Sequence, residues 1–145
     1  MKISILCEGR LNKSLENDLC KIYINRTLSL KKSGILDFNI KSFSNLKLSE
    51  ILKKKGLIKN IILDENGKNL STEQLSKNII DLNNNSVQQL NFFIGKPEGF
   101  TYNVDKFEKM SLSKMTLPHS LARVILCEQI YRCATIITNH PYHKY

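Results

Sequence analysis

Short apolar runs along the first two thirds of the chain alternate with longer segments whose apolar residues recur at helical spacing. The short runs are residues 3–7, 35–40, 58–63 and 90–94. The longer segments are residues 14–30, 46–55 and 71–82. Short β-branched runs are typical of buried strands, and strands that alternate with helices form mostly parallel sheets. We therefore predict an α/β fold in which helices flank a mostly parallel sheet, in one domain over residues 1–145.

The apolar positions of these predicted helices indicate which residues share one helix face. They are Leu15, Leu19, Ile22 and Tyr23 in the first helix, Leu48, Ile51 and Leu52 in the second, and Leu75, Ile79, Ile80 and Leu82 in the third. Gly56 is expected to end the second helix, and either Ser71 or Thr72 to cap the third. Residues 64–67 are predicted to form a turn.

A fourth predicted helix follows Pro118, with Thr116 just before it. Its apolar residues spread around most of its circumference, and its charged residues do not share one face. The apolar set is Leu121, Val124, Ile125, Leu126, Ile130, Cys133 and Ala134. Such a helix is buried on nearly all sides, either in a subunit interface or as the central core helix of a monomer.

The composition narrows the range of partners. A net charge of +9 on 145 residues indicates a polyanionic partner or an acidic membrane surface, unless an AT-rich genome has simply filled the surface with lysine. No apolar run is long enough to span a bilayer, and residues 1–7 are too short for a secretory signal. We therefore expect a cytoplasmic protein that does not enter a membrane.

The four cysteines lack the spacing of a redox or zinc motif. Each lies within an apolar segment, so buried thiols in a reducing compartment are the simplest interpretation. A zinc site made by Cys127, Cys133 and His140 is conceivable, but this spacing matches no usual ligand pattern. We expect no metal.

Three loops follow apolar runs and contain small or polar residues: the loop after Leu63, the loop that starts at Gly95, and residues 112–117. Ligands of open parallel sheets bind beyond the carboxyl ends of the strands, where such loops lie. From the glycines alone, a purely turn-forming role is the simpler interpretation, because the pattern is neither a dinucleotide fingerprint nor a P-loop.

The last seven residues, 139–145, concentrate polar and aromatic side chains. They include His140, Tyr142, His143 and Lys144, which together offer stacking faces, hydrogen-bonding groups and a cation. Single-stranded RNA loops are recognised by such side chains, although a frayed chain end is the common alternative.

The loop at residues 112–119 with the helix that follows it, the tail at residues 139–145, and the segment Ile94 to Gly99 together resemble the RlmH family. These are small SPOUT methyltransferases that methylate a pseudouridine of large-subunit ribosomal RNA. The resemblance implies a trefoil knot, in which the chain passes through its own loop and holds S-adenosylmethionine in a bent shape. The implied cofactor-binding residues are Leu63, Gly95, Leu112, Ser113, Lys114, Met115, Thr116 and Leu117. The family usually has glycine where this chain has Lys96, and arginine where it has Lys144.

The resemblance also implies the reaction and the partners. The expected product is a pseudouridine methylated at N3 in helix 69 of 23S ribosomal RNA, within an assembled ribosome. The expected assembly is a homodimer through the helix after Pro118. Because the imide proton of N3 must leave, a proton acceptor is needed, and His143 is the candidate base, with Tyr142 and Lys144 beside it. His119, Arg123 and His140 are candidate substrate-binding residues, although His119 could serve only at the helix terminus.

Two other kinds of function remain open at this level. One is an inactive RNA-binding or ribosome-binding SPOUT module, or an active SPOUT enzyme that methylates another RNA position. The other is a flavodoxin-like domain that binds a small molecule, which the alternating strands and helices alone would allow. The flavodoxin-like interpretation leaves the last helix and the tail unexplained.

Overall fold

A computed structural model describes residues 1–145, except the side chains of residues 45 and 46. Five parallel strands form one sheet in the order β2-β1-β4-β3-β5. The strands are β1 (Lys2–Glu8), β2 (Asp37–Phe43), β3 (Ile58–Asn69), β4 (Gln89–Ile94) and β5 (Glu108–Ser111). The α/β fold with a parallel sheet flanked by helices is thereby confirmed.

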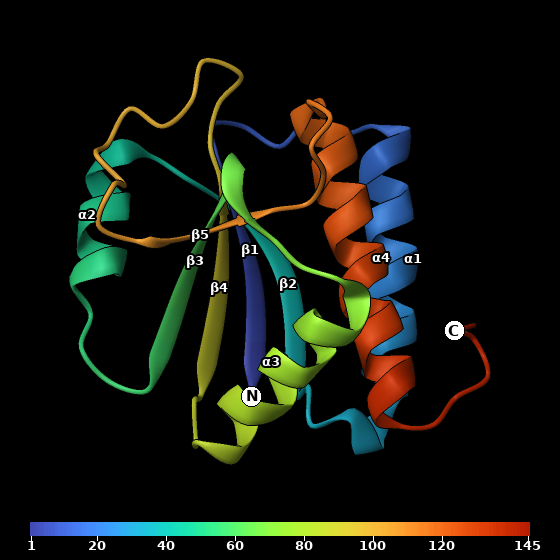
Figure 1. Cartoon of the computed structure of the whole chain (residues 1–145). Coiled ribbons are helices and arrows are strands. Elements are labelled where there is room, and N and C mark those ends of the chain that lie inside the picture. The colour runs from blue at the N-terminus through green and yellow to red at the C-terminus, as the bar shows by residue number, and fades with distance from the viewer.

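Four α-helices cover the two faces of the sheet, and α1 and α4 run side by side over one of them (Figure 1). The helices are α1 (Leu15–Ser29), α2 (Asn45–Lys53), α3 (Thr72–Asn84) and α4 (His119–Ile137), with a short 3-10 turn at Lys31–Ser33. The larger hydrophobic core lies between the sheet and α1, α3 and α4, and a smaller one lies beneath α2. As predicted, Leu48 is fully buried, and Ile51 and Leu52 pack against the same small core.

The first helix exposes residues that its sequence pattern placed on one apolar face. Leu15 is 81% exposed, and Leu19 and Ile22 are each 44% exposed. Cys20 and Thr27 are buried instead, and Tyr23 packs against the large core. Of the four residues predicted to share one face, only Tyr23 therefore packs against the core, and the other three face away from the sheet. In α3, Ile80 is likewise 37% exposed, while Leu75 and Ile79 are buried.

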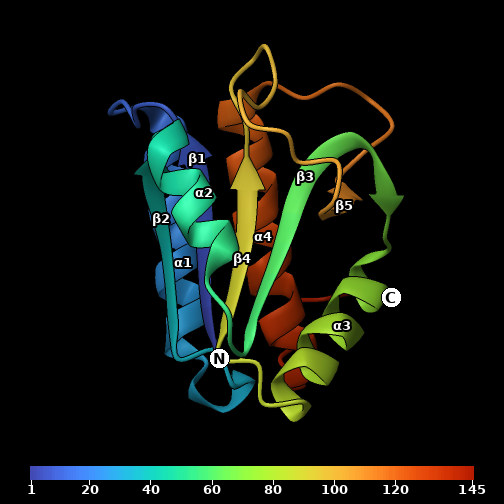
Figure 2. The same ribbon diagram turned by 90° about the vertical axis from the view of Figure 1, so that its left-hand side faces the viewer.

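Strand β3 continues through the predicted turn. Leu63 and Lys68 both pair with Met110 of β5, so residues 64–67 bulge out of the ladder. An Asx turn forms there, because the amide of Asn66 donates to Oδ1 of Asp64 at 2.8 Å. Figure 2 shows β3 arching over at this point before the chain enters α3. The change of direction was predicted correctly, but the end of the strand was not.

Two further boundaries differ from the sequence pattern. Strand β2 begins at Asp37 rather than at residue 35, because the amide of Ile35 donates to Oγ of Ser33 at 3.2 Å and pairing with β1 starts only at Asp37. The short edge strand β5 was not predicted at all. Its four residues begin with Glu108 and Lys109, and only Met110 and Ser111 are buried, so the strand carries almost no hydrophobic signal.

Ser71 starts α3 with a complete capping box. Its Oγ accepts from the amide of Gln74 at 3.1 Å, and the Gln74 side chain accepts from the amide of Ser71 at 2.9 Å. We expect Ser71→Ala to lower the free energy of unfolding by about 1 kcal/mol, because the amide of Gln74 loses its hydrogen-bond acceptor at the start of the helix. Urea unfolding measures this difference. Ser44→Ala is the matched control, since Ser44 precedes α2 without a side-chain cap bond in the described part of the chain, and an equal loss there would contradict the assignment.

Candidate functional site

A cavity of about 690 Å³ opens at the carboxyl ends of β3, β4 and β5. Its walls come from residues 63–66 after the straight part of β3, residues 94–105 after β4, and residues 109–113 and 115–117 around the end of β5. His119 and Ala122 of α4 complete it. Three loops that are distant in the sequence therefore meet at one place, because parallel strands all end at the same edge of the sheet.

The predicted cofactor-binding residues gather at this cavity with one exception. Those that line it are Leu63, Gly95, Leu112, Ser113, Met115, Thr116 and Leu117. Lys114 lies in the same loop, but it is exposed and is not part of the lining. Phe100, Glu65 and Ala122 also line the cavity but were not predicted. Phe100 and Glu65 belong to no motif, and Ala122 is one small residue of a helix without a distinct polar face.

Hydrogen bonds hold the loop after β5 in shape. The hydroxyl of Ser111 donates to the carbonyl of Ser113 at 2.8 Å, and the amide of Met115 donates to the hydroxyl of Ser113 at 2.9 Å. Thr116 was expected to help begin α4, but its hydroxyl donates to Oε2 of Glu65 at 3.0 Å, and Pro118 precedes the helix without a side-chain cap. The Thr116–Glu65 bond joins the loop after β5 to the bulge in β3 across the cavity.

The loop after β4 leaves little room for a side chain at its first position. A Cβ on Gly95 would lie 3.0 Å from the ring of Phe100 and 3.1 Å from its amide nitrogen. The amide of Gly99 closes a tight turn onto the carbonyl of Lys96 at 2.7 Å. In the described part of the chain, Ser86 and Asn139 are the non-glycine residues with positive φ, so Lys96 carries no such strain.

The cavity fits the cofactor that the resemblance implies. Its volume lies within the range of about 300–1,000 Å³ that small-molecule pockets span. Leu63, Ile94 and Phe100 offer apolar contact for a nucleoside, while the loops offer backbone donors and acceptors. Glu65 and Glu98 are among the residues of the wall, and negative charge there suits a cationic ligand such as a sulfonium.

His119 and Arg123 occupy the first turns of α4 but point to different neighbours. His119 lines the cavity, and its pKa is lowered by burial and by the nearby Arg123, so the imidazole is neutral at pH 7. The guanidinium of Arg123 donates to Oδ1 of Asn17, near the start of α1, at 3.2 Å. Only His119 of this predicted pair is therefore part of the cavity wall.

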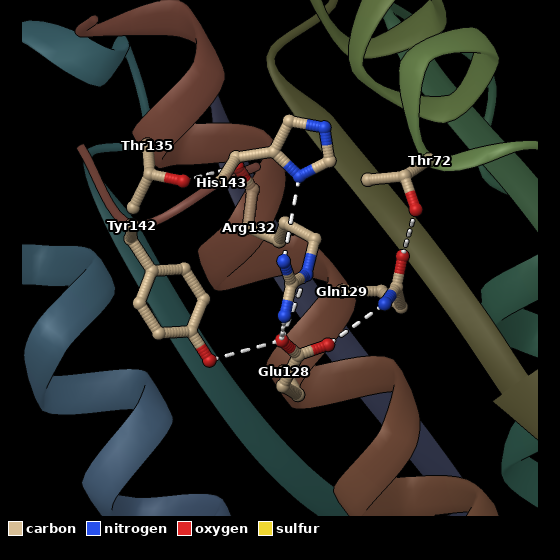
Figure 3. A network of polar contacts seen from close by, with 7 residues as sticks. All are labelled: Thr72, Glu128, Gln129, Arg132, Thr135, Tyr142 and His143. Atoms are coloured by element: carbon tan, nitrogen blue, oxygen red, sulfur yellow. Dashed lines mark hydrogen bonds and ion pairs between the residues drawn. The ribbon is translucent and has the colours of Figure 1, made fainter. Parts of the chain in front are cut away.

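The tail, residues 139–145, folds back along α4 instead of fraying (Figure 3). The hydroxyl of Tyr142 donates to Oε1 of Glu128 at 3.1 Å, and the guanidinium of Arg132 lies 4.8 Å from the centre of its ring. His143 lies between Arg132 and Glu73, and its side chain is 8% exposed. The amide of Tyr142 donates to Nδ1 of His140 at 3.3 Å, and Lys144 is exposed.

The tail and the cavity lie at different places along α4. Arg132, which contacts His143, follows His119 by more than three helical turns, about 20 Å along the axis. His140, Tyr142, His143 and Lys144 are not part of the cavity wall. Within one chain, the structure brings the candidate cofactor-binding residues together but keeps the candidate base away from them.

The cysteines are free, and all four are buried. Burial raises the pKa of Cys7 and of Cys133 to about 12, so both stay protonated thiols at neutral pH. Cys133 points its sulfur at the carbonyl of Thr72, while Cys127 lies beside Cys20 in the core.

In the part of the chain that the structure describes, no three His, Cys, Asp or Glu side chains lie close enough to hold a metal ion together. None of the described helices is long and apolar enough to cross a membrane.

Comparison with known proteins gives matches over nearly the whole chain. Residues 1–143 match the family model described as "Predicted SPOUT methyltransferase". The chain is 37% identical to the "Ribosomal RNA large subunit methyltransferase H" of Christiangramia forsetii, over 99% of each chain. Proteins with the same description from Mycoplasma mycoides and Fusobacterium nucleatum are 39% and 36% identical, over 99% of this chain and 100% of theirs.

Proposed function

The chain belongs to the SPOUT methyltransferase family, within its group of large-subunit ribosomal RNA methyltransferases H, and from this we propose that it methylates 23S ribosomal RNA with S-adenosylmethionine. Membership of the family implies the trefoil knot. The observation that carries the proposal is the meeting of three separate loops, around Leu63, Gly95 and Leu112 to Leu117, at one cavity of cofactor size. We assign the protein to the cytoplasm, where ribosomes are found.

The finer proposal is that the methyl group goes to N3 of a pseudouridine in helix 69 of the assembled ribosome. S-adenosylmethionine, when bound, supplies an electrophilic methyl group on a sulfonium. The loops around Gly95 and Ser113 would hold it, and the negative charges of Glu65 and Glu98 would favour its positive charge. His119, neutral and at the cavity wall, offers the nucleobase a hydrogen bond.

Removal of the imide proton requires a base close to the methyl group, and His143 is the residue that we propose for this step. We expect His143→Ala to lower the single-turnover rate on the order of 100-fold at neutral pH, because proton transfer by a positioned base contributes that much. Rapid quench with labelled cofactor measures it. A rate close to that of the unchanged protein across neutral pH would remove His143 from the mechanism.

Because His143 lies about 20 Å along α4 from the cavity of its own chain, we propose that a second copy brings its tail to that cavity. The exposed stripe of Leu15, Leu19 and Ile22 on α1, with Leu121 of α4 at 43% exposure, offers the apolar surface that a homodimer would bury. Helices α1 and α4 pack against each other, so the interface would include both.

Mass spectrometry of ribosomal RNA nucleosides tests the function directly. Ribosomes from a strain that lacks the modification are incubated with this protein and S-adenosylmethionine, and the expected product is N3-methylpseudouridine in the large-subunit RNA. Methylation at another nucleotide would replace the finer proposal by a different RNA target. Cofactor binding without any transfer would contradict the proposed substrate, and the absence of both would favour an inactive ribosome-binding module.

Ribosome binding is expected to weaken steeply with salt. The net charge of +9 supports contacts with several phosphates, and each contact adds about 0.7–0.9 to the slope of log affinity against log salt. Filter binding between low and physiological potassium chloride measures this slope. The affinity for S-adenosylmethionine is the internal control, because this small ligand carries no chain of phosphates from which counterions are released, and we expect its affinity to change far less. A flat salt dependence for ribosomes would argue against docking through the basic surface.

A further inference from the structure

Glu128 is the central residue of the hydrogen-bond network that holds the tail (Figure 3). Its Oε1 accepts three hydrogen bonds, from Nε of Arg132 at 2.9 Å, from Nη2 of Arg132 at 2.6 Å and from the hydroxyl of Tyr142 at 3.1 Å. Its Oε2 accepts from the side-chain amide of Gln129 at 2.7 Å. The Glu128 side chain is 17% exposed and that of Arg132 is 27% exposed, so water screens this pair only partly.

Arg132, which Glu128 holds in place, contacts both tail side chains, Tyr142 and His143. Its guanidinium lies over the ring of Tyr142, and its Nη1 is 3.4 Å from Nδ1 of His143. Arginine can only donate, so Nδ1 of His143 must accept. The ring proton then resides on Nε2, which lies 3.3 Å from a carboxylate oxygen of Glu73 on α3. Glu128 thereby fixes the Tyr142 ring directly and acts on the His143 tautomer through Arg132, while Glu73 favours the same tautomer by accepting from Nε2.

We propose that Glu128 is a positioning residue for methyl transfer: it holds Arg132 and Tyr142 so that the tail presents Tyr142 and His143 in one fixed arrangement to the substrate. This inference rests on the proposed function and adds a residue to it. Glu128 itself lies outside the cavity wall and acts only through its two partners. The His143 tautomer that it fixes leaves Nδ1 as the nitrogen that can take up a proton once the substrate displaces Arg132.

The position of Gln129 strengthens this interpretation. Its amide group donates to Oε2 of Glu128, while its carbonyl oxygen accepts from the hydroxyl of Thr72 on α3 at 2.7 Å. The carboxylate is therefore braced from a second helix and cannot rotate freely. Burial and the bond to Glu128 raise the pKa of Tyr142 to about 12, so its hydroxyl remains a donor throughout the neutral range.

Glu128→Gln tests the proposal, because the amide keeps the size of the side chain but removes the charge that holds Arg132. The matched control is Glu50→Gln, the same chemical change at an exposed position of α2, away from the cavity and the tail. For each variant we would measure the single-turnover rate on ribosomes, the affinity for S-adenosylmethionine, the melting temperature and the nitrogen NMR signals of the histidines. The signals of His143 are assigned by their loss in His143→Ala.

We expect Glu128→Gln to lower the single-turnover rate on the order of 100-fold, as a displaced catalytic group does. Cofactor affinity and melting temperature should match those of Glu50→Gln, and the fraction of His143 protonated at Nε2 should fall, because Glu73 alone then favours that tautomer. A rate within about twofold of the unchanged protein, or an unchanged tautomer, would overturn the proposal. So would a rate loss that is matched by equal losses of cofactor affinity and melting temperature, since that would be a folding effect.

The tautomer measurement also separates this inference from the proposed function. It needs no substrate, so a protein that transfers no methyl group to ribosomes would still reveal whether Glu128 holds the tail. Absence of transfer by the unchanged protein, together with the expected tautomer shift in Glu128→Gln, would count against the proposed substrate alone. Absence of the shift would count against the role of Glu128 whatever the substrate is.

Discussion

Two inactive variants of this chain are expected to regain methyl transfer when they are mixed. The first, Ala122→Phe, places a ring in the cavity wall and blocks the cofactor. The second is a chain that ends at Pro141, which removes Tyr142 and His143 but leaves the cavity complete. A mixed dimer then contains one site in which an intact cavity meets an intact tail from the other copy.

The size of the recovery follows from random pairing. After exchange of subunits, about half of the dimers are mixed and each has one complete site out of two, so roughly a quarter of the normal rate should return. Each variant is first unfolded and refolded alone, and should stay inactive. The mixture is refolded in the same way and assayed on ribosomes. Size-exclusion chromatography of both variants tests whether each forms the proposed dimer, and cofactor binding by the shortened chain tests its cavity.

The same experiment can contradict the shared site. If each chain used its own tail, a mixed dimer would contain no complete site, and the mixture would remain as inactive as its components. Activity in the shortened chain alone would show instead that Tyr142 and His143 are not needed for the reaction. Chromatography that finds only monomers would remove the dimer itself from the proposal.

Gly67→Ala is expected to cause the largest loss of stability in the fold. A Cβ at this position would lie 2.7 Å from the carbonyl carbon of Lys109 and 2.7 Å from the amide nitrogen of Met110. Both atoms belong to the backbone of β5, which cannot rotate out of the way as a side chain can. Overpacking of this kind costs about 3 kcal/mol, at the upper end of its usual range.

Urea unfolding of Gly67→Ala measures this cost, with Lys68→Ala as the control at the next, exposed position. The control is expected to change the free energy of unfolding by no more than about 0.5 kcal/mol. Because β5 leads directly into the loop that lines the cavity, the glycine variant should also lose cofactor affinity. Equal stability of the two variants would mean that β3 and β5 can separate at this bulge without cost.

Most strands and helices were predictable because they carry their own periodic signal. The run at residues 58–63 and the helix face of Leu48, Ile51 and Leu52 were correct, since burial on one side selects apolar residues at a fixed spacing. The strand β5 was missed, because a short strand at the sheet edge buries only two residues. The cap of α3 was narrowed to Ser71 or Thr72 by residue type, and the structure selects Ser71.

The candidate site likewise contains some residues that the sequence could indicate and others that it could not. The three loops at Leu63, Gly95 and Leu112 could be proposed together from the sequence, because a parallel sheet always gathers the ends of its strands. Glu128 and Arg132 were visible only as charges without a common helix face. Their role depends on the tail folding back so that Tyr142 and His143 lie beside them. A sequence pattern does not indicate where a chain end will pack.

The sequence by itself determined the alternation of strands and helices, the parallel sheet and the family, because local spacing and short motifs are written in neighbouring residues. The tertiary structure decided where the sides of the helices face and where the tail lies. It turned Leu15, Leu19 and Ile22 outward and placed His143 far from the cavity of its own chain. These outcomes depend on contacts between residues far apart in the chain, whose packing is chosen by the whole fold and not by any single segment.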